Sequence, residues 1–154
     1  MYRADNAHGI SYNCEYVVKT HVDNDNEKYY TYIADTYFYG GGAHGSSFVI
    51  VKNINVNTGK IVSLKDIFVP GYEKALCDII IKKICKKFDA KNLEDLRSKS
   101  VFYGIDVYPS QNFIIGEKSI TFIYSPDEIA FHAAGEIRVE INNSDIKDIL
   151  KKQD

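Results

Sequence analysis

The residues with the clearest chemical potential form a glycine run at residues 39–45, with the sequence Tyr-Gly-Gly-Gly-Ala-His-Gly. The spacing Gly40-x-Gly42-x-x-Gly45 matches a dinucleotide-binding fingerprint, in which glycines let the backbone approach a pyrophosphate at the start of a helix. His44 and Ser46 could also act as base and nucleophile in a hydrolase. The elements on either side of the run decide between these chemistries.

The segment after the run argues against a dinucleotide site. Residues 46–51 read Ser-Ser-Phe-Val-Ile-Val, a β-branched stretch without helical periodicity, so a strand follows where the fingerprint needs a helix. Asp66 lies about twenty residues beyond the run, where a ribose-binding acid is expected. Because no strand-helix-strand unit can be built here, no pyrophosphate site lies beside Asp66, and we expect no cofactor.

The remaining catalytic and metal patterns are incomplete. No Gly-Lys-Ser/Thr follows the glycines, and the run contains no G-x-S-x-G elbow. The histidines His8, His21, His44 and His132 are scattered without metal-ligand spacing. We therefore expect no catalytic residues and no metal, and we expect His44 to lock the glycine turn through its ring nitrogens.

The composition narrows the class of protein. The chain has 154 residues and a formal charge of −2, which suits one folded domain and provides no basic footprint for nucleic acid. The local exception is a lysine run that we interpret as a solvated helix face: Lys82, Lys83, Lys86, Lys87 and Lys91. No apolar run reaches 18 residues and the first residues lack a signal-peptide core. The cysteines, Cys14, Cys77 and Cys85, have no CxxC spacing, and we expect buried free thiols.

Alternating apolar residues predict the first hairpin. Residues 11–22 alternate strictly, with Tyr12, Cys14, Tyr16, Val18 and Val22 on one face, which is typical of a half-buried strand. The Asp-Asn-Asp-Asn cluster at residues 23–26 predicts the turn. Residues 28–39 carry aromatic side chains on both faces, which indicates a central strand. Tyr29 and Tyr37 share one face of it and are the best candidates for an exposed aromatic row.

The rest of the chain continues as hairpins around one main helix. Strands are expected at residues 47–56, 61–64, 112–115, 119–124 and 136–141, and short helices at residues 92–99 and 145–151. Tyr72, Leu76, Ile79, Ile80, Ile84 and Phe88 form the apolar stripe of the main helix. The fold class is therefore α+β, an antiparallel sheet of hairpins with one main helix packed on it.

Four segments of the chain form a combined pattern: residues 39–45, residues 57–60 with 64–68, residues 112–113 with 120–122 and 126–130, and residues 133–135. Taken together, they resemble the extracytoplasmic domain of RsiV-type anti-sigma factors, which also accompanies the catalytic domain of PdaC-type deacetylases. Residues 39–45 are similar to that family's Tyr-x-Gly-Gly-Ala-His-Gly signature. The resemblance spans residues 12–150 in consistent order. It implies one domain over residues 1–154, with a truncated N-terminal hairpin subdomain at 1–45 and the characteristic C-terminal part at 46–154.

The resemblance also implies a role and a location. In the anti-sigma branch the domain looks like a sensor that binds lysozyme, and in the deacetylase branch it accompanies a peptidoglycan enzyme. We therefore expect a non-catalytic, extracytoplasmic binding domain whose partner is a lysozyme-like hydrolase or peptidoglycan. Its candidate binding residues are Tyr29, Tyr37, Tyr39 and His44, and its structural residues are Gly40, Gly41, Gly42, Gly45, Asp66, Glu128 and Gly135. The alternatives are a hydrolase acting on cell-wall glycan and a structural or dimerisation module.

Overall fold

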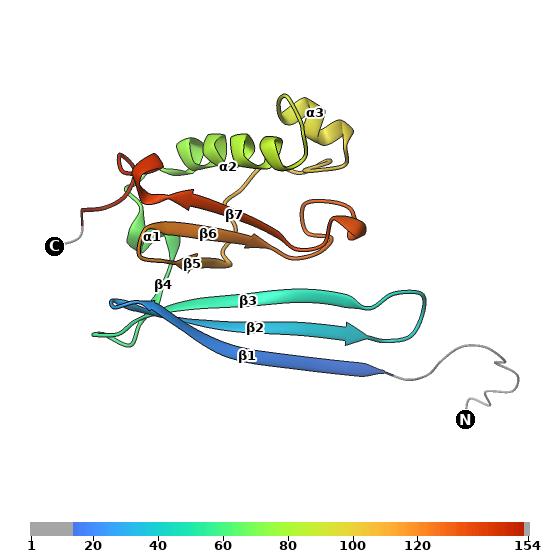
Figure 1. Ribbon diagram of the computed structural model, residues 1–154, viewed down its shortest axis with the longest axis horizontal. Coiled ribbons are helices and arrows are strands. Elements are labelled where there is room, and N and C mark those ends of the chain that lie inside the picture. The colour runs from blue at the N-terminus through green and yellow to red at the C-terminus, as the bar shows by residue number, and fades with distance from the viewer. Residues whose placement is uncertain (1–13, 153–154) are drawn as a thin grey trace, which may run out of the picture.

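The chain folds into two antiparallel sheets with few helices, which confirms the α+β class. The computed structural model describes residues 14–152. The first sheet has the order β1-β2-β3-β4, with β1 at Glu15–Asn26, β2 at Tyr29–Tyr39, β3 at Ser46–Asn55 and β4 at Ile61–Val62. The second sheet contains β5 (Phe113–Ile115), β6 (Ser119–Tyr124) and β7 (Ile137–Asn142). Figure 1 shows the second sheet between the first sheet and the helices α2 and α3.

The division into two sheets differs from the single sheet that the sequence predicts. Along the edge of β3 that faces away from β2, only two residue pairs are formed with β4. Farther along this edge the backbone N–H groups donate to side chains that flank β6 and β5, from Val49 to Ser125 Oγ at 3.1 Å and from Val51 to Asn112 Oδ1 at 3.0 Å. Because side chains take these donors, the backbone ladder does not continue into β5.

The predicted first turn is wrong by a few residues. β1 runs through the Asp-Asn-Asp-Asn cluster, with a register irregularity between Asp23 and Asn26, and the turn itself is Glu27–Lys28. Asn26 Oδ1 accepts the Lys28 backbone N–H at 2.9 Å, which closes this shorter turn. β2 then lies between β1 and β3, as its two-faced aromatic pattern predicts.

The half-buried character predicted for β1 is also wrong. Tyr16 and Val22 are 65% and 60% exposed, and Val18 and Cys14 are exposed as well. Tyr12 lies outside the described residues. The alternation is real, but β1 is an edge strand and no layer of the described chain covers its apolar face.

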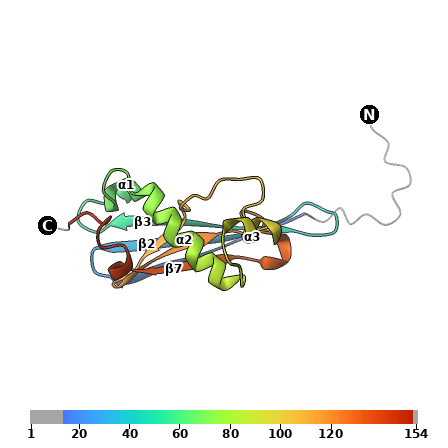
Figure 2. The same ribbon diagram turned by 90° about the horizontal axis from the view of Figure 1, so that it is seen from above.

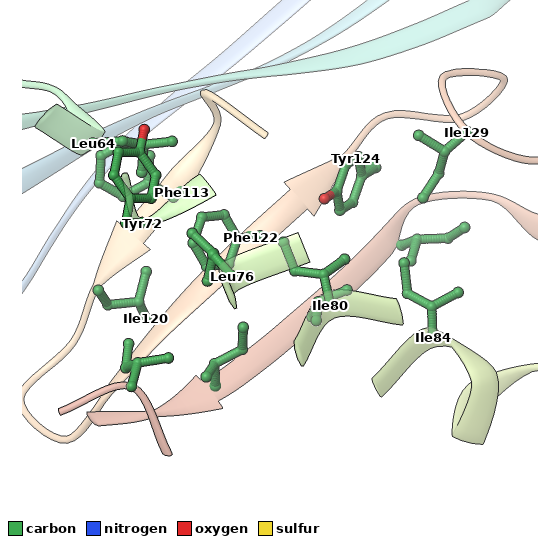
Figure 3. Packing of buried hydrophobic residues seen from close by; sticks show 14 of the residues in the cluster. Leu64, Tyr72, Leu76, Ile80, Ile84, Phe113, Ile120, Phe122, Tyr124 and Ile129 are labelled. Atoms are coloured by element: carbon green, nitrogen blue, oxygen red, sulfur yellow. The ribbon is translucent and has the colours of Figure 1, made fainter. Parts of the chain in front are cut away.

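The main helix, α2, spans Glu73–Lys87 and confirms the periodic stripe. Leu76, Ile80 and Ile84 are fully buried, and Figure 3 shows them pointing toward Phe122 and Tyr124 of β6. Seen from above in Figure 2, α2 crosses obliquely over the strands. The predicted lysine face is solvated too, since only Lys83 is half-buried and lies 3.7 Å from Asp145. This helix and the second sheet enclose the main hydrophobic core.

The short helices agree less well with prediction. Helix α3 (Leu93–Ser98) lies where it is expected, and Asn92 Oδ1 caps it by accepting the Asp95 N–H at 2.9 Å. A further helix, α1, spans Leu64–Ile67, and short 3-10 turns, η1 and η2, lie at His132–Ala134 and Asn143–Asp145. The predicted terminal helix is absent from the described residues after η2. There the chain pairs with residues 67–69 instead, through the Val69 N–H to Ile149 and the Lys151 N–H to Ile67.

The three cysteines are free, and two of them are shielded as expected. Cys85 is buried and Cys77 is half-buried, with its thiol 3.3 Å from the Val107 carbonyl oxygen. Burial raises the pKa of both thiols. Cys14 is the exception, since it is exposed at the start of β1.

Candidate functional site

The glycine turn joins β2 to β3, so the element that follows it is a strand and not a helix. Gly41 and Gly42 have φ of +93° and +105°, a conformation that side-chain-bearing residues rarely adopt. A Cβ on Gly45 would lie 2.5 Å from ring carbons of Tyr37, so a side chain at this position would displace that ring. These observations confirm that the run is a backbone device.

The residue that fastens the glycine turn is Tyr39 rather than His44. The Tyr39 hydroxyl donates to the Gly42 carbonyl at 2.8 Å, a bond that the sequence analysis missed. His44 makes no hydrogen bond to any residue in the described part of the chain. Its ring lies against His132, with centroids 5.5 Å apart, so the predicted lock through His44 is wrong.

The polar groups around His44 do not assemble into a hydrolase-like set among residues 14–152. His132 Nδ1 lies 2.7 Å from Asp127 Oδ2, which pairs a histidine with an acid. Ser46 contributes no hydrogen bond to either histidine in this part of the chain. The same residues contain no cluster of three side chains that could hold a metal ion.

The acidic residues Asp66 and Glu128 stabilise local structure through hydrogen bonds. Asp66 Oδ2 accepts the Ser63 backbone N–H at 2.8 Å and the Ser63 hydroxyl at 2.7 Å, which closes the first turn of α1. These hydrogen bonds hold the pKa of Asp66 below its ordinary value. Glu128 accepts the Ser125 N–H at 2.7 Å and the Tyr108 hydroxyl at 2.8 Å.

Two further residues, Tyr108 and Gly135, also take part in local structure. Burial and the neighbouring Glu128 carboxylate raise the pKa of Tyr108. Gly135 ends the 3-10 turn η1 with φ of +64°.

The predicted tyrosine pair lies on the inner face of β2, toward the second sheet. Tyr29 is half-buried against the main core. Tyr37 is 37% exposed and lines a groove of about 410 Å³ together with Lys19, Asp35 and Glu136. The two tyrosines are separated along β2 by Ile33, which is buried between the sheets, so they do not form one exposed row.

The exposed aromatic row lies on the opposite side of the first sheet. Because partners in the β1–β2 and β2–β3 registers share a face, the even-numbered residues of the three strands point outward together. We call their exposed apolar members the outer face: Tyr16, Val18, Val22, Tyr30, Tyr32, Phe38, Phe48 and Ile50. The alternation of residues 16–22 carries this signal in the sequence, but alternation alone does not show whether the apolar face of a strand is covered.

A second candidate is a polar cleft of about 540 Å³ at the end of the molecule where several turns meet. Figure 1 shows the β1–β2 turn, the β3–β4 turn, the β5–β6 hairpin and the C-terminal segment gathered at this end. Amide side chains line the cleft, namely Asn26, Asn55, Asn57 and Asn143, and Tyr29 contributes to its wall. No local sequence pattern marks this cleft, since its residues come from six separate segments.

No helix of the described chain is long and apolar enough to cross a membrane. The comparison with curated proteins finds no match. Two solved structures share the fold, a DUF3298 family member from Bacteroides fragilis (TM-score 0.84, 24% identity) and one from Pseudomonas aeruginosa (TM-score 0.73, 18% identity).

The matches cover 92% and 88% of this chain, but 56% and 62% of those two chains, so this chain spans less than two thirds of their length. The family model described as "protein of unknown function (DUF3298)" matches residues 65–144, just over half of the chain. The chain therefore belongs to the DUF3298 family.

Proposed function

We propose that this chain is a non-catalytic binding domain of the bacterial cell envelope that recognises a cell-wall hydrolase of the lysozyme type. The observation that carries the proposal is the outer face of the first sheet. Eight large apolar side chains are exposed there on three neighbouring strands, and a contiguous exposed patch of this kind marks an interaction surface.

The chemistry of the outer face favours a protein partner. It combines aromatic rings with aliphatic side chains, and the rings of Tyr16 and Phe38 contact each other edge to face, with centroids 6.5 Å apart. Aromatic residues are enriched in the buried centres of protein interfaces. The resemblance to RsiV-type sensors supports a secreted hydrolase as the partner, and it also supports the extracytoplasmic location.

The experiment measures retention of lysozyme and of insoluble peptidoglycan by the immobilised chain. We expect retention of lysozyme, and we expect the double variant Tyr16→Lys with Val22→Lys to lose it, because two charges would be buried in the interface. Both side chains are more than half exposed, so the fold tolerates lysine there. The matched control is Tyr103→Lys with Ile105→Lys, an exposed aromatic and aliphatic pair outside the outer face.

The outcomes separate the alternatives. Loss of lysozyme binding in the control as well as in the double variant would remove the outer face from the proposal. Retention of peptidoglycan without lysozyme would overturn the hydrolase partner, and retention of neither would overturn both. A stable dimer that the double variant dissociates would instead support a dimerisation module, and release of reducing sugar from peptidoglycan would support an enzyme.

A further inference from the structure

We infer that the polar cleft beside Tyr29 is a binding site for an uncharged saccharide. This inference concerns a different surface from the outer face and does not rest on the function proposed above. The cleft volume, about 540 Å³, lies within the range of small-ligand sites, about 300–1,000 Å³.

The walls of the cleft are fixed by hydrogen bonds between the segments that form them. Asn26 Nδ2 donates to the Gly116 carbonyl at 3.1 Å, which ties the β1–β2 turn to the β5–β6 hairpin. Asn55 Oδ1 accepts the backbone N–H groups of Asn57 and Thr58, each at 3.0 Å. The Asn143 backbone N–H donates to the Lys118 carbonyl at 2.8 Å. The cleft is therefore preformed, so a ligand does not have to order its walls.

Other polar groups of the cleft are left available to a ligand. Within the described residues, the Tyr29 hydroxyl, the Asn57 side-chain amide and the Lys152 ammonium group have no hydrogen-bond partner. These groups provide several donors, and the amide and hydroxyl oxygens also accept. Such mixed donors and acceptors match sugar hydroxyl groups, each of which both donates and accepts.

The charges of the cleft favour an uncharged ligand. Asp66 and Glu117 line it together with Lys28, Lys151 and Lys152, so acidic and basic groups are nearly balanced. A polyanion would meet the two carboxylates, and an apolar ligand would leave the amides without partners. The walls are mainly turns rather than an open strand edge, so they offer no ladder to an extended peptide.

Asn143 provides a buried acceptor atom that lacks a hydrogen-bond donor. Its Oδ1 atom is buried and has no hydrogen-bond partner among the described residues, while its Nδ2 atom donates to the Glu117 carbonyl at 3.2 Å. An unsatisfied buried acceptor destabilises the free protein. A small rotation of this side chain toward the cleft would let a sugar hydroxyl or acetamido N–H donate to it.

The test is calorimetric titration of the full chain with the trimer of N-acetylglucosamine. We expect saturable binding that Tyr29→Phe and Asn57→Ala each weaken severalfold and Asn143→Ala weakens at least tenfold. Tyr29→Phe removes only the hydroxyl and leaves the packed ring. The matched control, Asn142→Ala, removes an exposed amide next to Asn143 that does not line the cleft, and it should leave the affinity unchanged.

Stability gives a second readout. Asn143→Ala should change the thermal midpoint of the free chain little, because removal of the unsatisfied acceptor offsets the lost hydrogen bond to the exposed Glu117 carbonyl, while it lowers the affinity. The inference is overturned if the trimer does not bind, if the three cleft variants bind it as well as the parent chain does, or if a neutral tripeptide or an anionic sugar binds instead. Unchanged sugar binding by the double variant Tyr16→Lys with Val22→Lys would show that this site is independent of the outer face.

Discussion

Asn53 of β3 donates from its side-chain amide to the backbone carbonyl of Phe113 in β5, at 2.7 Å, and so joins the two sheets. Asn53 is 1% exposed. Its Oδ1 atom accepts the Thr31 hydroxyl at 2.8 Å and the Ile115 N–H at 3.3 Å. A buried amide with all of these partners fixes the position of the first sheet against the second, since each partner would otherwise be buried and unsatisfied.

We expect Asn53→Leu to destabilise the chain by about 2 kcal/mol or more. The substitution leaves a buried hydroxyl, carbonyl and N–H at the junction of the sheets without hydrogen-bond partners. Urea unfolding measures the loss. Asn142→Ala, at an exposed amide of β7, is the control and should change the midpoint little. Equal stability of Asn53→Leu and the parent chain would show that the two sheets do not depend on this junction.

A side chain in the glycine turn should destabilise the chain through backbone strain. Gly41→Val places a β-branched residue at φ of +93°, and strain of this kind costs about 1–3 kcal/mol. A thermal melt of the variant should therefore show a lower midpoint. Ala43→Val, two residues along in the same exposed turn, is the matched control. A Gly41→Val midpoint equal to that of Ala43→Val would contradict the structural role of the turn.

Asp66 should make the stability of the chain fall in acid. Its hydrogen bonds with Ser63 lower its pKa in the folded state below the ordinary value of about 3.9 in the unfolded chain. The stabilisation is present above that ordinary value and is lost as the pH falls through the lowered folded pKa. Unfolding free energies at pH 7 and pH 3 should therefore differ less in Asp66→Asn than in the parent chain. An equal difference in both would exclude this contribution.

The three thiols should react at different rates. Cys14 is exposed, whereas burial shields Cys77 and Cys85 and raises the pKa of both, so little reactive thiolate is present. In a time course with a maleimide followed by mass spectrometry, the first label should appear on Cys14, and Cys85 should be labelled only after denaturant is added. Cys14→Ser should remove the fast phase. Early labelling of Cys85 would show that α2 opens readily.

The sequence predicted those elements whose pattern is set by their own residues. The stripe from Tyr72 to Phe88 predicted the main helix, because a period of 3.6 allows few other structures. The strand predicted at residues 119–124 has the same bounds as β6. The glycine run was correctly interpreted as a turn, since a strand follows it. The predicted terminal helix failed because pairing of residues 149–151 with residues 67–69 took the backbone groups that a helix would use.

The sequence by itself therefore determined the class of fold, the main helix and the glycine turn, because local periodicity and backbone sterics specify them. Only the tertiary structure decided which face of the first sheet is covered, since alternation shows that a strand has two faces but not which one meets a neighbour. The tyrosine row was accordingly assigned to Tyr29 and Tyr37, whereas Tyr30 and Tyr32 are on the open side. The polar cleft likewise depends on long-range contacts, because its six segments are brought together only when the sheets pack.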